Sequence, residues 1–350
     1  MNTKRMTALF MAVMVVFLTA CGSKPGYPVS DDTAGGDAYM DGDVYAGGDA
    51  YYEEEPESEW GPVDVQPEPV PDYSESQPEF TTEPVEDDIH IRVEGDTLYF
   101  SGVGTVQSED YGSYDPVNVV IEDGITGIGN SAFEKCRNLQ SVILPDSLRI
   151  IGSFAFYECI QLTSIVLPDG VESIERDTFA GCTWLTSVVL PSGLKEIQQE
   201  AFTGCISLDS IDLPNSLQSI GASAFRACES LTAVTIPGSV DSLPGGYIDG
   251  AFQGCSSLTS VTICDGVRTI GRCTFANSGL TSVTIPDSVE TIETEAFIDC
   301  RNLTEVTFGG GITSIDPNLA DCPLTRVKAP NSIQELIIKS GIDLSIVEWY

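Results

Sequence analysis

The sequence contains few basic side chains. Lys and Arg together number 16 against 53 Asp and Glu, which gives a formal net charge of −37. Both parts of the chain are acidic: residues 22–88 hold 20 acidic residues and one lysine, and residues 89–350 hold 33 acidic residues against 13 basic ones. Such a chain repels phosphate, so its composition argues against nucleic acid as a partner.

The sequence also lacks the motifs of common catalytic and metal sites. It contains no Gly-x-Ser-x-Gly, no His-Glu-x-x-His, no phosphate-binding loop and no Cys-x-x-Cys. Its one histidine, His90, lies in a segment where apolar and polar residues alternate. We therefore interpret His90 as an exposed polar residue of a strand and not as a catalytic residue. We therefore predict no enzymatic activity, no cofactor and no metal.

Only the N-terminus carries a long apolar run. Lys4 and Arg5 precede the run from Thr7 to Ala20, which is short for a membrane span, and this order is typical of an export signal in residues 1–20. Cys21 directly follows Leu-Thr-Ala, as in the lipobox of bacterial lipoproteins. We expect cleavage before Cys21, lipidation of its thiol, and an outward-facing protein anchored to the cell membrane. An ordinary signal peptide, with Cys21 incidental, is the alternative.

Residues 21–88 show no apolar periodicity. The segment from Gly22 to Asp88 holds nine Pro among many Asp, Glu, Gly and Ser residues. A segment of this composition buries too little apolar surface to offset its chain entropy, so we expect a disordered acidic linker.

The rest of the chain is dominated by a repeat of 23 residues. The stretch from Ile128, IGNSAFEKCRNLQSVILPDSLRI, is followed by homologous stretches from Ile151 and Ile174, and copies continue to residue 328. Such a period predicts a solenoid of stacked units. We expect a hairpin cap and leading half-repeat at 89–127, with its turn at Gly95-Asp96, the solenoid at 128–328, and a C-terminal cap at 329–350.

Each repeat divides into two halves. In Leu-x-x-Val-x-Leu-Pro the first, fourth and sixth side chains are expected to point inward from a short parallel strand that the proline ends. The Ile-Gly-x-x-Ala-Phe-x-x-Cys half is expected to be a short helical turn whose Phe and Cys pack against the strands. The predicted fold class is an α/β repeat solenoid with one short parallel strand per repeat. A four-residue insertion at Pro244 to Asp249 predicts a protruding loop.

The repeat resembles the BspA-type leucine-rich repeats of bacterial surface proteins, whose unit is Ile-Gly-x-x-Ala-Phe-x-x-Cys-x-x-Leu-x-x-Val-x-Ile-Pro. The resemblance covers about Val119 to Pro330, and residues 332–342 resemble the helix-turn-strand cap that follows such arrays. It implies an exported protein with a role in adhesion or interaction at the cell surface. It supplies no catalytic residue.

Ten cysteines remain after Cys21. We expect those at the repeat position to be buried thiols, because stacked cysteines have parallel Cβ vectors and a disulfide needs converging ones. Cys264 and Cys273 depart from the pattern and are the two candidates for a disulfide. The repeat position holds Cys136, Cys159, Cys182, Cys205, Cys228, Cys255, Cys300 and Cys322.

One outward column of the predicted strands changes character along the array. Ile143, Val166 and Val189 are apolar, whereas later repeats carry Asp212 and then threonines, and Trp184 stands in a slot that other repeats fill with polar residues. These four residues are candidates for binding a protein or glycan partner. Two alternatives stay open: the β-branched residues only support the strands, or the whole solenoid is a passive spacer without a specific ligand.

Overall fold

The computed structural model describes residues 87–108, 111–114, 116–246, 250–315 and 317–350. The predicted signal peptide and lipidation site lie outside the described residues, as do the predicted linker except for Asp87 and Asp88, and residues 247–249 of the insertion. The chain divides into two units, Met1–Gln77 and Pro78–Tyr350, and every described element belongs to the second.

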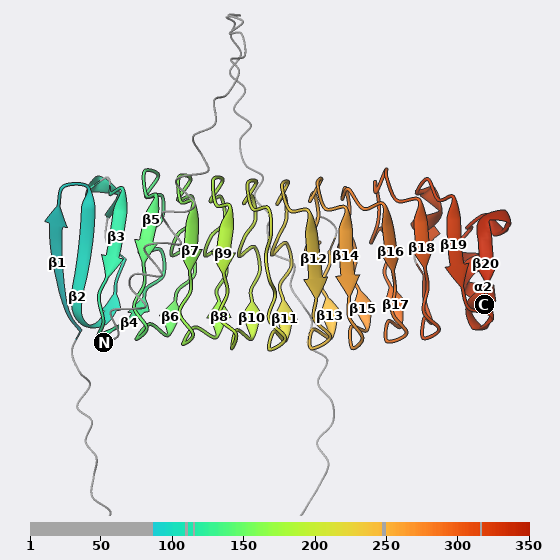
Figure 1. Ribbon diagram of the computed structural model, residues 1–350, viewed down its shortest axis with the longest axis horizontal. Coiled ribbons are helices and arrows are strands. Elements are labelled where there is room, and N and C mark those ends of the chain that lie inside the picture. The colour runs from blue at the N-terminus through green and yellow to red at the C-terminus, as the bar shows by residue number, and fades with distance from the viewer. Residues whose placement is uncertain (1–86, 109–110, 115, 247–249, 316) are drawn as a thin grey trace, which may run out of the picture. The chain divides into compact units, whose positions relative to one another are not determined.

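The second unit is a solenoid in which two rows of strands run along the stack (Figure 1). The longer strands form what we call the major row: β3 (Asn118–Ile121), β5 (Ser141–Ile143), β7 (Ser164–Val166), β9 (Ser187–Val189), β12 (Ala233–Ile236), β14 (Ser260–Ile263), β16 (Ser282–Thr284), β18 (Glu305–Thr307) and β19 (Arg326–Ala329). The minor row holds β4 (Ile125–Ile128), β6 (Ile150–Ile151), β8 (Ser173–Ile174), β10 (Glu196–Ile197), β11 (Ser219–Ile220), β13 (Ser242–Leu243), β15 (Thr269–Ile270) and β17 (Thr291–Ile292). The solenoid and its major strand are confirmed; the minor strand was not predicted.

Strands within a row pair in parallel, one coil apart. Val166 pairs with Val189 in the major row and Ile174 with Ile197 in the minor row, so both registers carry the 23-residue period. The inward side chains follow the prediction: Leu162 and Ile165 are buried, while Ser164 and Val166 on the same coil are exposed.

A column of phenylalanine rings fills the space between the rows. Neighbouring rings lie 5.1 to 5.7 Å apart at interplanar angles of 1° to 19°, and every ring is at most 1 % exposed. Stacked aromatic rings bury large areas, so this column is a major part of the hydrophobic core, which also contains the inward Leu, Ile and Val of both rows. It consists of Phe133, Phe156, Phe179, Phe202, Phe225, Phe252, Phe275 and Phe297.

The predicted helical turn in the Phe-Cys half is wrong. Its N–H groups alternate between two acceptors: Cys136 N–H bonds within the coil to the Phe133 carbonyl, whereas Phe133 N–H bonds to Ala155 of the next coil. A helix would direct all these groups along its own axis. Left-handed residues such as Ser131 (φ 56°) and Lys135 (φ 60°) reverse the chain between these bonds. The half-repeat is therefore a ladder of turns, and the repeat contains little helix.

The N-terminal hairpin is present where alternation predicts it. β1 (Asp88–Glu94) pairs antiparallel with β2 (Thr97–Val106), and Gly95 in the turn has a φ of 62°. β2 pairs along its first half with β3 and along its second half with β4, so it joins both rows. A 3-10 turn, Tyr111–Tyr114, follows it.

At the C-terminal end, one α-helix lies among the described residues. α2 (Gln334–Lys339) buries Ile337 and follows a 3-10 turn at Asn331–Ile333. Another 3-10 turn, Leu344–Ile346, leads into β20 (Val347–Trp349), which pairs with β19. The helix agrees with the predicted helix-turn-strand, but the strand begins later, at Val347. The capping role of both ends stays a prediction.

Candidate functional site

The candidate binding residues on strands form one outward column of the major row. Val166 pairs with Val189 on β9, and Ile143 occupies the same position on the neighbouring β5. Ile143, Val166 and Val189 are 52 %, 52 % and 51 % exposed. Three half-exposed aliphatic side chains in a row form a continuous apolar surface. Single exposed apolar residues are common on protein surfaces, whereas a continuous apolar surface is typical of interaction sites.

The same column continues into the N-terminal hairpin, which the sequence comparison of repeats missed. Val120 on β3 pairs with Ile143, and Tyr99 on β2 pairs with Val120. At the N-terminal end of this column, the Arg92 guanidinium lies 4.0 Å from the centroid of the Tyr99 ring and makes a cation–π contact with it. We call Tyr99, Val120, Ile143, Val166 and Val189 the apolar stripe. Counting 23 residues back from Ile143 would have found Val120; Tyr99 is offset by the hairpin and gives no such signal.

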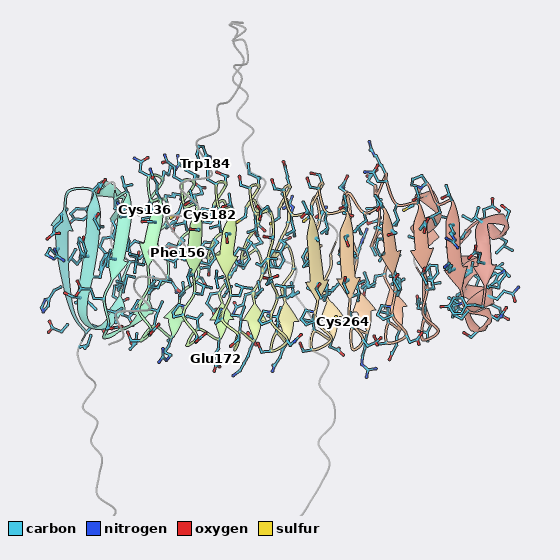
Figure 2. All side chains as sticks on the ribbon, viewed as in Figure 1. Cys136, Phe156, Glu172, Cys182, Trp184 and Cys264 are labelled. Atoms are coloured by element: carbon cyan, nitrogen blue, oxygen red, sulfur yellow. The ribbon has the colours of Figure 1, made fainter. Side chains whose placement is uncertain are left out.

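Trp184 is exposed but lies outside the apolar stripe. Its side chain is 64 % exposed, and its backbone N–H bonds to the Ile160 carbonyl in the turns before β9. Figure 2 shows it at the upper margin of the unit, beyond the strand ends. It precedes Val189 by five positions along the chain. Trp184 therefore lies on the rim of the major row.

The apolar stripe ends where the major row is interrupted. The coil after β9 forms no strand at residues 209–213, so β9 and β12 belong to separate sheets. A depression with a volume of about 240 Å³ lies there, lined by Ser187 to Leu190 and Ser210 to Asp212. Aspartate is depleted in strands, and this coil carries Asp209 and Asp212 where most other coils carry Thr or Gln and Ile, Val or Thr, respectively.

One of the remaining outward columns has a structural explanation. Its threonines bond through Oγ1 to the carbonyl one coil earlier, as Thr186 does to Thr163 at 3.1 Å and Thr304 to Thr281 at 3.2 Å. These bonds tie coils together, so this threonine column needs no ligand to account for it.

The repeat cysteines are buried thiols, as predicted. Seven of them donate from Sγ to the carbonyl of a phenylalanine in the preceding coil, for example Cys182 to Phe156 at 3.2 Å (Figure 2). Burial raises the pKa of the Cys255 thiol to about 12. Such thiols are poor nucleophiles and poor metal ligands, because both roles need the thiolate.

The two cysteines outside the repeat position are also thiols in the structure. Cys264 is half-buried in the turn after β14, and Cys273 is buried beside Glu295, whose Oε2 lies 3.7 Å from its Sγ. Burial and the Glu295 charge raise the pKa of Cys273. Across the described ranges, no group of three His, Cys, Asp or Glu side chains is arranged for a metal ion, and no helix is long and apolar enough to cross a membrane.

The repeat geometry agrees with a family match. The sequence profile of the BspA type leucine rich repeat region matches residues 111–232 and 230–340. The chain belongs to the BspA-type leucine-rich repeat family. Its members are typically bacterial surface proteins, and the leucine-rich repeat is in general a scaffold for protein interactions.

Solved structures of bacterial leucine-rich repeat proteins are also similar. A protein from Bacteroides ovatus is 22 % identical, with 77 % of this chain and 100 % of that chain covered and a TM-score of 0.46. A leucine-rich cell surface protein from Faecalibacterium prausnitzii is 20 % identical (71 % of this chain and 95 % of that chain covered, TM-score 0.33). A leucine-rich repeat protein from T. pallidum is 26 % identical (55 % and 86 % covered, TM-score 0.36). The comparison with curated proteins found no match.

Proposed function

We propose that this protein is exported, anchored by lipid on Cys21, and binds a protein or glycan partner at the cell surface through the apolar stripe. The observation that carries the proposal is the row of half-exposed Ile143, Val166 and Val189 on paired or neighbouring strands. Water must order around such a surface unless a partner covers it, so covering it is favourable by about 25 cal/mol per Å² of apolar area.

Trp184 supplies a second contact in this proposal. A tryptophan on the rim, 64 % exposed, offers a large and rigid surface to a partner already seated on the stripe. Its loss should weaken binding by about 2 kcal/mol while the fold remains intact, because few of its atoms are buried.

A direct binding measurement tests the proposal. The full chain, purified in a mild detergent, is compared with a stripe variant, Val166→Thr with Val189→Thr, which restores the threonine that later coils carry at this position. Immobilised matrix proteins, mucins and glycans serve as probes. Saturable binding that the stripe variant loses supports the proposal, whereas the absence of binding by either protein favours the passive spacer.

The anchor is tested separately. Intact-mass spectrometry of protein from cell membranes should show a chain that begins at Cys21 and carries the mass of a diacylglycerol. Cys21→Ser should release an unlipidated chain from the membrane fraction. A cleaved chain without added lipid would leave an ordinary export signal and remove the anchor from the proposal.

A further inference from the structure

In the middle of the major row, the charges on the outward face are concentrated in one coil. In the seven coils from Gln140 to Thr284, the three outward columns hold Thr, Ser, Gln, Ala, Ile and Val, and their two charged residues are Asp209 and Asp212. Both belong to the coil that interrupts the row, whereas the other charges of the row lie further along, on β18 and β19. On a chain of net charge −37, this otherwise uncharged part of the face therefore carries two carboxylates at the end of the apolar stripe.

Asp212 occupies the next position of the stripe itself. It follows Val189 by one repeat, it is exposed, and it lines the depression of about 240 Å³ together with Val189 and Leu190. In the part of the chain that the structure describes, no residue donates a hydrogen bond to the Asp212 carboxylate, and no Lys, Arg or His forms an ion pair with it. The Asp209 carboxylate differs, since Oδ1 accepts a hydrogen bond of 2.8 Å from Ser210 Oγ.

The depression thus places the apolar side chains of Val189 and Leu190 beside two serines and the Asp212 carboxylate. A lysine or arginine side chain fits this combination, because its methylene stem packs on apolar surface while its charged end meets an acid. Charge also selects among partner classes: acidic glycans and phosphate groups are repelled here, whereas protein segments can supply a cation and apolar side chains together.

We infer that the stripe and the depression bind one extended protein segment, with aliphatic or aromatic side chains on the stripe and a lysine or arginine beside Asp212. This inference rests on the proposed function and names the partner class of the same site. Strands spaced about 4.8 Å apart place Asp212 roughly 24 Å from Tyr99, a length that about seven extended residues span.

The test is selection of peptides on the full chain from a random 12-residue phage library, followed by affinity measurements on the selected peptides. Asp212→Asn removes the carboxylate, and Asp265→Asn, in the exposed turn after β14, makes the same charge change away from the face. Selected peptides should carry Lys or Arg next to aliphatic or aromatic residues. Asp212→Asn should weaken them about 5- to 10-fold at low salt and less at high salt, whereas Asp265→Asn should leave the affinity unchanged.

Two other results separate the inference from the proposed function. Peptides that need the stripe but bind Asp212→Asn as well as the native chain, or that lack a cation, overturn the inference and leave the proposed function standing. If no peptide is selected, or if selected peptides bind the stripe variant unchanged, the inference fails, and the panel of matrix proteins, mucins and glycans decides the proposed function separately. Thermal unfolding of each variant confirms that the comparison is made on folded protein.

Discussion

Val166 and Val189 stand opposite each other on the paired strands β7 and β9, and each leaves about half of its side chain in water, 52 % and 51 %. The coils of Thr235, Thr262 and Thr284 place a hydroxyl at this position on the same kind of strand. Threonine and valine have similar shapes and strand propensities, so the ladder itself does not require valine here. The apolar choice is confined to one end of the major row.

Replacing an aromatic side chain by alanine should affect stability strongly at the buried Phe179 and weakly at the exposed Trp184. Phe179 is fully buried between Phe156 and Phe202, with ring centroids at 5.5 and 5.4 Å. Phe179→Ala should lower the free energy of unfolding by about 3–5 kcal/mol, because it removes buried area and leaves a cavity. Trp184→Ala should change it by about 0.5 kcal/mol or less, since its ring is mostly in water. Urea denaturation measures both; equal losses would contradict the exposed position of Trp184.

A glycine at Ala227 should stabilise the protein. Ala227 has a φ of 56°, and the equivalent Gly204 and Gly254 have 71° and 76°. The left-handed conformation costs an alanine about 1–2 kcal/mol, part of which is offset by the extra chain entropy that glycine loses on folding. We expect Ala227→Gly to raise the free energy of unfolding by about 0.5–1 kcal/mol. Ala224→Gly, at a fully buried alanine outside the left-handed set, is the matched control and should lower it.

The buried thiols should make the fold sensitive to alkali. Burial raises the pKa of Cys255 from 9.0 to about 12 in the folded protein, so the folded state keeps a proton that the unfolded state loses above pH 9. Stability from this group is therefore fully present below pH 9 and falls as the pH rises toward 12, by about 1.4 kcal/mol per pH unit.

Unfolding by urea at several pH values measures this effect. Between pH 9 and 10.5, Cys255→Ser should lose less stability than the native chain, whatever its stability at neutral pH. Burial also raises the pKa of the Cys205 thiol, so Cys205→Ser should likewise lose less stability than the native chain over this pH range. Identical pH slopes for native and variant proteins would show that these thiols do not ionise on unfolding.

Sequence periodicity predicted the stack, the major strand and the buried Phe and Cys, because a residue that repeats every 23 positions must occupy the same place in every coil. It did not predict the minor strands, which are two residues long in most coils and too short to show alternation. It also misassigned the turn half as helical. The decisive interactions there are hydrogen bonds between coils, such as Phe133 to Ala155, which a single repeat read alone does not contain.

For the candidate site, the sequence correctly predicted outward positions for Ile143, Val166 and Val189. The extension to Tyr99 depends on how the hairpin pairs with β3, a tertiary contact outside the repeat register. The depression at Asp212 depends on the loss of a strand in one coil. The sequence did contain a signal for the lost strand, because Asp209 and Asp212 stand at positions where most other coils carry β-branched residues. Aspartate is unfavourable in strands, so this coil is the one expected to lose its strand.

Biolayer interferometry of the full chain and the stripe variant, Val166→Thr with Val189→Thr, against the panel of matrix proteins, mucins and glycans shows whether the apolar stripe is the contact surface. Thr262→Val with Thr284→Val, the reverse exchange further along the same column, is the control. We expect saturable binding that the stripe variant weakens about tenfold or more and the control leaves unchanged. Equal binding by all three proteins would contradict this expectation, because the apolar stripe would then lie outside the contact surface.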